Sequence, residues 1–392
     1  MASPHRAGVC RRGQVLINEL TFHWQVPTSG DGPQLIGGRG PQRRGGLDYL
    51  LHIACVAEEL GFDGVMLPTG VATEDGALLA AALATRTDRL KLMVSFRAGP
   101  ELPAHFAQRI ATLQQLCGPR IQVCLFNGFE TEQRSYGDFI EHDEAYRRAD
   151  EFLSIATALW RGEPVQHASP HYLLDRREGG RALQAQPQVF AFGASDAAGE
   201  VVARHADVHM MWAEPPALVA QRVQRTLALA AEAGRELRLG LRVAVLARDT
   251  EEEAWEEAGR LLAGIPDGAI EQAQREFGRS RSVGLARIRA LHRQGRLRGL
   301  RELEVSPNLW AGSALVRGTT TLVGSHAQVA ERLAEYAALG LRSFVLSGVP
   351  NLDAVRRIGE QVLPRLSRYS QKEIVVPLAA ADAYIGMQGV PP

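Results

Sequence analysis

The sequence predicts an α/β protein, a (β/α)8 TIM barrel with insertions. Short apolar segments of strand length alternate with helical segments along nearly the whole chain, which is typical of parallel strands joined by helices. The strand–helix units number about eight, which favours a closed barrel over an open sheet. The long interruption at about 265–325 is expected to be an insertion with its own helices.

Each element is predicted from its apolar spacing and its end signals. Leu50, Ile53, Ala54 and Ala57 recur at helical spacing, and Gly61 follows them as a stop. The weakly alternating segment Val165–Leu174 predicts an inserted hairpin. The expected strands are Val15–Trp24, Val65–Leu67, Leu90–Phe96, Ile121–Phe126, Val189–Ala194, Val208–Trp212, Leu237–Ala247 and Arg342–Leu346. The expected helices are Leu47–Leu60, Gly76–Thr85, Pro103–Leu116, His142–Trp160, Asp196–His205, Ala217–Ala233, Thr250–Leu262, His326–Leu339 and Leu352–Leu366.

Length and charge limit the function classes. The 392 residues are 45% hydrophobic, enough for a single large barrel domain over 1–392 with flexible tails at 1–13 and about 368–392. Forty-four basic residues balance forty-four acidic ones, so no net field favours nucleic acid or an anionic membrane. The four cysteines lack metal-type spacing and no signal peptide or membrane span is evident, so a cytoplasmic protein without a metal site is expected.

In barrels of this class, function collects at the C-terminal ends of the strands. The residues that follow the expected strands are Gln25–Ser29, Gly70–Asp75, Arg97, Asn127, Ser195, Trp212, Arg242–Ala244 and Ser347–Asn351. They are therefore the candidates for a site.

Several of these positions have both a chemical and a purely structural interpretation. Gly193, Ala194 and Ser195 join a strand to a helix N-terminus, which can bind a phosphate group or be a plain N-cap. Arg242 lies in an apolar strand, so its partner is either an internal carboxylate or an anionic ligand. Trp212 can form the wall of a pocket or pack in the core.

The segment Leu303–Gly324 is apolar and glycine-rich and carries one arginine, Arg317, between Gly312 and Gly318. It is either a surface loop with a solvated arginine or a loop that closes over an anion. Motifs for a metalloprotease, a serine hydrolase, a P-loop or a Rossmann dinucleotide site are absent from the sequence.

The sequence resembles the luciferase-like flavin monooxygenases, and within them the two-component alkanesulfonate monooxygenases. The resemblance runs from about residue 21 to about residue 366, and its most specific pieces are LPTGVATED (67–75), EHDEAYRRADEF (141–152), MWAEPP (211–216), SPNLWAGSALVRG (306–318) and EYAALGLRSFVLSG (335–348). It implies a homodimer or homotetramer that takes reduced FMN from a separate NAD(P)H-dependent flavin reductase. The resemblance further implies that reduced FMN reacts with the co-substrate O2 to give a peroxyflavin. This peroxyflavin would oxidise a small organic substrate, such as a sulfonate or another anion.

The resemblance also assigns roles to individual residues. Arg242, Arg317 and Trp212 match the arginine of the active site, the arginine of a closing loop and the tryptophan beside flavin and substrate. The turn Gly193–Ser195 matches the phosphate-binding turn. Tyr146 and His142 match an HxExY stretch near the phosphate, although a His–Tyr pair at this spacing can also be structural.

Other pocket positions depart from the family pattern. Thr73 replaces a cysteine and Asn127 a threonine on the cofactor side, and Ala244, Val349, Asn351 and Ser29 replace side chains that can titrate. We expect an FMNH2-dependent monooxygenase with a pocket re-lined for a different substrate. A catalytically degenerate barrel that acts as a flavin-binding or partner subunit is the alternative, and a deazaflavin-dependent hydride-transfer enzyme is a third reading.

Overall fold

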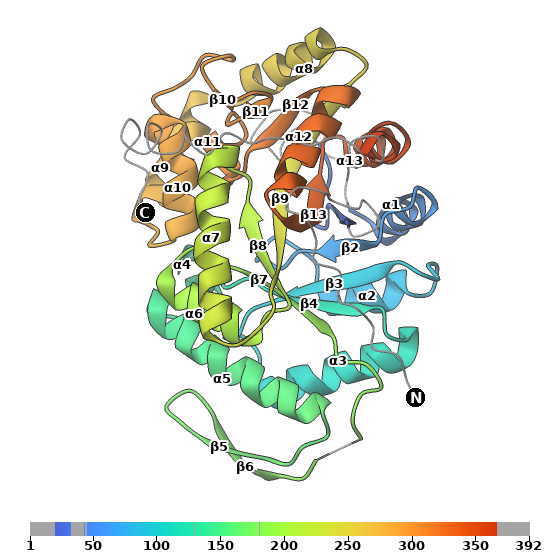
Figure 1. Ribbon diagram of the computed structural model, residues 1–392, viewed down its shortest axis with the longest axis vertical. Helices are drawn as coiled ribbons and strands as arrows, with labels where there is room; N and C mark the ends of the chain where they lie inside the picture. Colours follow the sequence, from blue (N-terminus) through green and yellow to red (C-terminus); the bar gives the residue numbers. More distant parts are fainter. Residues whose placement is uncertain (1–19, 33–42, 44, 129, 180, 367–392) are drawn as a thin grey trace, which may run out of the picture.

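The computed structural model describes residues 20–32, 43, 45–128, 130–179 and 181–366. Its centre is a closed barrel of eight parallel strands with helices on the outside, so the predicted (β/α)8 fold is confirmed (Figure 1). The barrel strands are β1 (Thr21–Gln25), β2 (Gly64–Leu67), β3 (Lys91–Phe96), β4 (Ile121–Leu125), β7 (Gln188–Phe192), β8 (Val208–Trp212), β9 (Arg238–Arg248) and β13 (Leu341–Ser347).

Helices follow the barrel strands and cover their outer faces. These helices are α1 (Leu47–Glu59), α2 (Gly76–Leu83), α3 (Pro103–Cys117), α5 (His142–Trp160), α6 (Asp196–His205), α7 (Pro216–Glu232), α8 (Glu251–Ala263), α12 (His326–Ala338) and α13 (Asn351–Arg357). Asp75, Ser195, Thr250 and Ser325 cap four of them by accepting backbone N–H groups, and Ser325 with Gln328 forms a full capping box. The chain between 358 and 366 continues as η4 (Ile358–Val362) and α14 (Leu363–Leu366).

The barrel closes where β8 pairs with β9. The register of this pair places Trp212 opposite Arg242, and β9 pairs on its other side with β13. β9 has 11 residues, which is longer than the other barrel strands. Its second half, Ala244–Arg248, pairs with β12 (Thr321–Ser325) outside the barrel. One strand therefore closes the barrel and also holds the insertion.

The interior of the barrel is filled by side chains. Met66, Met93, Phe190 and Met210 form an apolar layer with Cys124, which is fully buried as its strand pattern predicts. Burial raises the pKa of the Cys124 thiol to about 12, so it behaves as a small apolar side chain. The filled interior leaves the ends of the strands as the place for a ligand.

The predicted insertion is confirmed, and it forms a second small core against α8. It contains α9 (Asp267–Arg279), α10 (Val283–Leu291), η3 (Arg293–Gly295), β10 (Glu304–Ser306), β11 (Leu309–Trp310) and α11 (Ala314–Arg317) before β12. Figure 1 shows these elements at one end of the molecule, with the hairpin β5 (Val165–Ala168) and β6 (Leu173–Arg177) at the other. The short helix α4 (Glu130–Ser135) was not predicted.

The interpretation of Leu303–Gly324 as an exposed loop is wrong for most of the segment, although Arg317 itself is exposed. Its middle part pairs antiparallel as β10–β11–β12, and Leu303, Leu309 and Leu315 are at most 1% exposed. The alternation of small and large apolar residues reflects packing rather than solvent exposure, because Gly312 leaves room for the Trp310 ring.

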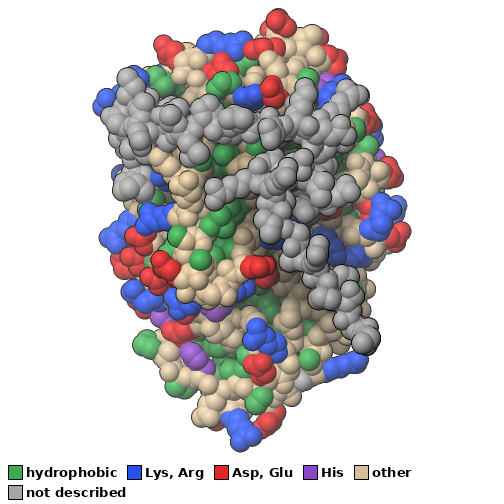
Figure 2. All heavy atoms as spheres, in the orientation of Figure 1, with side chains coloured by type: hydrophobic (Ala, Val, Ile, Leu, Met, Phe, Trp, Pro, Cys, Tyr) green, Lys and Arg blue, Asp and Glu red, His purple; other side chains and the backbone are tan. Residues whose placement is uncertain are grey.

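The surface carries mixed charges. Figure 2 shows acidic and basic side chains interspersed over the described part of the visible face. Within the described residues, the structure contains no helix that is long and apolar enough to cross a membrane.

We predict that Gly312→Ala lowers the free energy of unfolding by about 1–3 kcal/mol, as overpacking in a filled core does. A Cβ at this position would lie 1.9 Å from a ring carbon of Trp310, so the ring must shift. Urea unfolding followed by tryptophan fluorescence measures the change. The control is Gly268→Ala in α9, where a Cβ meets nothing within 4 Å and unchanged or slightly higher stability is expected. Wild-type stability of Gly312→Ala would contradict the packing argument.

Candidate active site

The carboxyl ends of the barrel strands surround two adjoining cavities. The larger has a volume of about 300 Å³, and the smaller, which we call the notch, has about 40 Å³. Most strand-end residues singled out in the sequence line the larger cavity, namely Gln25, Val26, Pro27, Thr28, Ser29, Thr73, Trp212, Arg242, Ala244, Ser347, Gly348, Val349 and Asn351. Asn127 and Ser195 line the notch instead, together with Trp212, which lines both.

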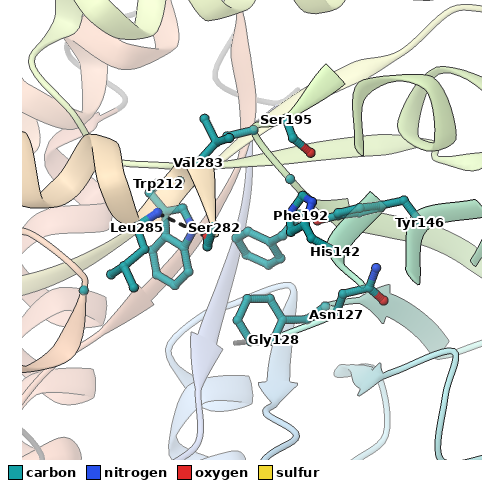
Figure 3. A pocket seen from close by; sticks show the side chains of 15 residues that line it. Asn127, Gly128, His142, Tyr146, Phe192, Ser195, Trp212, Ser282, Val283 and Leu285 are labelled. Atoms are coloured by element: carbon teal, nitrogen blue, oxygen red, sulfur yellow. Dashed lines mark hydrogen bonds between the residues drawn. The ribbon is translucent and has the colours of Figure 1, made fainter. Parts of the chain in front are cut away.

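Two helix N-termini meet at the notch. Ala194 and Ser195 precede α6, and Ser282–Leu285 form the start of α10 on the opposite side. Figure 3 shows Ser282, Leu285 and Trp212 on one side of the notch, and Phe192, His142, Tyr146 and Asn127 on the other. The first N–H groups of a helix lack partners within the helix and carry a partial positive charge. The notch is therefore suited to an anion.

The turn Gly193–Ser195 caps a helix and also lines the notch. The Ser195 hydroxyl caps α6 by accepting the Ala198 N–H at 3.2 Å, so the structural interpretation holds for its side chain. Position 193 requires glycine because its neighbours lie very close. A Cβ there would lie 2.3 Å from the Ala198 Cβ and 3.3 Å from the Tyr146 hydroxyl. The turn is thus pressed against Tyr146 at the wall of the notch.

Three further side chains of the notch carry polar groups. The Tyr146 and His142 rings are 5.2 Å apart edge to face, and burial raises the pKa of Tyr146 to about 12, so its hydroxyl keeps its proton at neutral pH. His142 lies 2.7 Å from the Asp143 carboxylate. Asn127 is 8% exposed, and its Nδ2 has no hydrogen-bond partner among the described residues. A buried amide donor of this kind indicates a missing acceptor.

Aromatic rings separate the notch from the large cavity. Phe126 and Trp212 line both spaces, with ring centroids 6.4 Å apart, and Phe192 lies 5.4 Å from Trp212. The three rings pack against one another, so a ligand that occupies both cavities must pass beside this cluster. Trp212 thus forms a pocket wall, as one of its two interpretations predicted.

Arg242 faces the large cavity rather than an internal salt bridge. Among the described residues it forms no ion pair, and its guanidinium carbon lies 4.6 Å from the centre of the Trp212 ring. Burial lowers its pKa to about 10, and the nearby Arg317 contributes to that lowering, so Arg242 remains a cation at neutral pH. Two guanidinium groups that line one cavity favour an anionic ligand.

Arg317 ends α11 and lines the same cavity. Desolvation lowers its pKa as well. Gly318 follows with φ of 63°, a left-handed conformation that glycine adopts without strain, and turns the chain toward β12. Arg317 is an exposed residue at the edge of the large cavity, and its role as a closing arginine stays a prediction.

Two of the replaced positions have structural partners. The Thr73 hydroxyl donates to the Gly70 carbonyl at 2.9 Å and so stabilises its own loop at the cavity edge. Asn351 is 2% exposed, and its Oδ1 accepts the Trp24 indole N–H at 2.7 Å. The Asn351 N–H donates to Asp31 at 2.7 Å. Asn351 therefore braces the end of β13 against β1, in addition to lining the cavity.

Buried polar atoms lie around the floor of the large cavity. Gln25 Oε1, Thr28 Oγ1 and Ser95 Oγ have no hydrogen-bond partner among the described residues, and all three residues line the cavity. Such atoms suit a planar ligand with carbonyl and N–H groups on one edge. In the part of the chain that the structure describes, no group of three or more His, Cys, Asp or Glu is placed to hold a metal ion.

The sequence analysis missed two features of the site. It did not assign Ser282–Leu285 to the notch, although a serine before an apolar helical run is an N-cap signal. It also named Arg97 without its partner. Arg97 is 6% exposed, forms an ion pair with Glu132 of α4, and lies below Gly128, while Glu132 itself lines the large cavity. Only the fold brings these distant residues together.

A closed α/β barrel with ligand cavities at the carboxyl ends of its strands has the architecture of barrel enzymes. The chain matches the model of the luciferase-like monooxygenase family over residues 22–343, and it belongs to that family.

Solved structures share the fold at low sequence identity. EDTA monooxygenase (EmoA) from Chelativorans sp. BNC1 is 19% identical, with a TM-score of 0.71 over 95% of this chain and 98% of that one. Riboflavin lyase (RcaE), solved with modified FMN and riboflavin, is 21% identical, with a TM-score of 0.69 over 94% and 96%. The coenzyme F420-dependent tetrahydromethanopterin reductase from Methanopyrus kandleri is 18% identical, with a TM-score of 0.61 over 88% and 99%.

The buried His209 on β8 generates a pH prediction. Burial, together with the nearby Arg222, lowers its pKa to about 4, so the folded protein keeps this ring neutral. The unfolded chain takes up the proton near the ordinary value of 6.5, so the free energy of unfolding falls as the pH falls from about 6.5 to 4. We expect His209→Gln to flatten this slope by up to about 1.4 kcal/mol per pH unit.

Denaturant unfolding at a series of pH values measures this slope. Between pH 7 and 9 the wild-type and variant curves should run parallel, which serves as the internal control. Equal slopes in the acid window would contradict the neutral state of His209 in the folded protein.

Proposed function

We propose that this protein is a monooxygenase that binds reduced FMN across both cavities and oxidises a small organic anion. The observation that carries the proposal is the pair of adjoining cavities at the barrel mouth. One is small and bordered by two helix N-termini, which suits a phosphate group, and the other is large enough for a ring system and a substrate. The aromatic side chains that line both cavities would pack against the flexible chain that links these two parts of FMN.

The residues of the notch fit the phosphate. A volume of about 40 Å³ holds only a few water-sized groups, too little for the ring system. The N-termini of α6 and α10 and the unpartnered Nδ2 of Asn127 supply donors to phosphate oxygens. The Tyr146 hydroxyl lies at the same wall and can add another.

The large cavity fits the ring and the substrate. The unpartnered atoms of Gln25, Thr28 and Ser95 are suited to the polar edge of an isoalloxazine ring, and Trp212 to its flat face. Arg242 and Arg317 would hold an anionic group of the substrate, such as a sulfonate or carboxylate. Leu246, Leu261 and Trp310 form an apolar wall for its body. Guanidinium groups bind sulfonates and carboxylates alike, so a sulfonate is one candidate among the small organic anions that Arg242 and Arg317 could hold.

The protein side chains supply position rather than acid–base chemistry. Among the described residues that line the large cavity, Glu132 is the only carboxylate, and it is paired with Arg97. Histidine, cysteine and tyrosine are absent from that lining within the same residues. When bound, reduced FMN supplies the electrons for the reaction with O2. A separate NAD(P)H-dependent flavin reductase would deliver it, and the aromatic and apolar walls would keep water away.

A deazaflavin cofactor with a long acidic tail fits the structure less well. The groove outside the notch is lined by four carboxylates and three guanidinium groups, and each guanidinium contacts a carboxylate. The pairs are Arg147 with Glu144, Arg225 with Asp196 and Arg281 with Glu141. A chain of acidic groups would meet no surplus of positive charge there, so a cofactor that ends at the phosphate is favoured.

We predict saturable binding of reduced FMN in an anaerobic fluorescence titration, and oxygen uptake above the rate of free reduced FMN when a suitable anion is added. A panel of sulfonates and carboxylates, with sulfite and aldehyde as readouts, tests the substrate class. Deazaflavin serves as the control ligand and should bind more weakly. Absence of saturation with reduced FMN up to the high micromolar range would reject the enzyme, whereas binding without any oxygen uptake would favour the degenerate partner subunit.

We expect Arg242→Met to lower turnover on the order of 10²-fold, because the variant removes a cation from a site with few other charges. Substrate saturation kinetics measure the effect, and anaerobic titration checks that FMN still binds. Arg242→Lys keeps the charge and should lose less. Unchanged turnover of Arg242→Met would remove the proposed contact between Arg242 and the anion.

A further inference from the structure

A buried charge network lies next to the notch. Glu214 follows β8 and its side chain is 1% exposed. It contacts Arg222 of α7 at 2.9 Å and Arg287 of α10 at 2.7 Å, and the Arg287 Nε lies 3.1 Å from both carboxylate oxygens. Two guanidinium groups thus share one buried carboxylate.

The network connects the two walls of the notch. On one wall, the Gly193 carbonyl accepts from Arg222 Nη2 at 3.5 Å and from His209 Nε2 at 2.9 Å. On the other wall, Arg287 belongs to α10, whose first turn lines the notch. The walls are close, because a Cβ on Gly284 would lie 3.8 Å from the Ala194 Cβ. Glu214 therefore fixes the start of α10 relative to the turn before α6.

The backbone at Ala213 and Glu214 is anchored by two further side chains. The Tyr336 hydroxyl of α12 donates to the Glu214 carbonyl at 2.7 Å, and the Thr320 hydroxyl donates to the Ala213 carbonyl at 2.7 Å. His209 is neutral and also contacts the Thr226 hydroxyl at 3.0 Å, which fixes the ring that holds Gly193. Side chains from α7, β8, α12 and the residue before β12 thus contribute to the spacing of the notch.

Stability alone explains this arrangement poorly. Burying three charged groups requires their removal from water, and well-packed apolar residues often stabilise a core as well or better. Burial lowers the pKa of Arg222, which reflects that cost. The Arg222 guanidinium, one hydrogen bond away from Gly193, instead contributes positive potential in the notch, where an anion with two charges gains most.

We propose that the Arg222–Glu214–Arg287 network is a positioning element that holds both walls of the notch at the spacing of a phosphate monoester and selects phosphorylated over unphosphorylated flavin. This inference rests on the proposed binding of FMN. Arg222 acts through the Gly193 carbonyl and through its charge, without touching the ligand. Arg287 acts through the position of α10.

The experiment compares two ligands that differ only in the phosphate, reduced FMN and reduced riboflavin. Anaerobic titrations of wild type and Arg222→Met give the ratio of the two dissociation constants. We expect wild type to prefer FMN by at least about tenfold, as charge-assisted contacts to a phosphate do. We expect the ratio for Arg222→Met to fall toward one, mainly through weaker FMN binding, with riboflavin affinity nearly unchanged.

The control is Arg120→Met, which removes another partly buried arginine at the opposite end of the barrel, where it donates to Cys117 and Thr87. It should keep the wild-type ratio. Equal weakening of both flavins in Arg222→Met, or an unchanged ratio, would overturn the positioning role. Wild type that binds both flavins equally would overturn it too, while leaving flavin binding intact. Wild type that binds neither flavin would reject the proposed function itself.

A second variant covers the case in which Arg222→Met does not fold. Arg222→Lys keeps the positive charge beside Glu214 but loses the planar double donor. An intermediate ratio, lower than that of wild type, is expected. A ratio equal to wild type in a folded Arg222→Lys protein, together with an insoluble Arg222→Met, would show that the charge suffices and would overturn the role of the contact to Gly193.

Discussion

The pairing of β8 with β9 is the constraint on which the rest of the site depends. Closing the barrel puts Trp212 and Arg242 directly opposite each other in the register of this pair, and the guanidinium then rests over the indole ring. The same closure places the Ala213–Glu214 segment under the insertion and turns Trp212 into the partition between the two cavities. Hydrogen bonds of a sheet thus fix the position of a cation that no carboxylate among the described residues holds.

Local patterns were sufficient for the barrel but not for the site. The strands and helices were predicted because apolar periodicity and caps such as Ser195 and Thr250 are local signals. The predicted strand ends include most residues that line the large cavity, because strand boundaries are also local signals. The contribution of Ser282–Leu285 and the Arg97–Glu132 pair depends on contacts across long stretches of chain, which single-sequence patterns do not encode. The segment Leu303–Gly324 resembled a loop because its glycines suggest a flexible backbone. In the structure, Gly312 instead leaves space for the Trp310 ring.

The replaced residues give the pocket a consistent character. Ala244 and Val349 contribute apolar lining to the cavity, and Asn351 braces two strands as well as lining the cavity. The two arginines remain, together with unpartnered polar atoms on the floor. A monooxygenase whose cofactor performs the chemistry can change its lining in this way, because position and charge are what the protein must supply.

The insertion grows from the second half of β9 and contributes to both cavities at once. Its α10 forms one wall of the notch, while Trp310 and Arg317 line the large cavity. A ligand that restrains the insertion at one cavity reduces the entropy that a second ligand must lose at the other. Thermodynamic reciprocity then makes each ligand raise the affinity for the other by the same factor. In the proposed function, the shape of this one segment would set how strongly cofactor and substrate depend on each other's presence, and hence how rarely reduced cofactor would meet O2 without a substrate beside it.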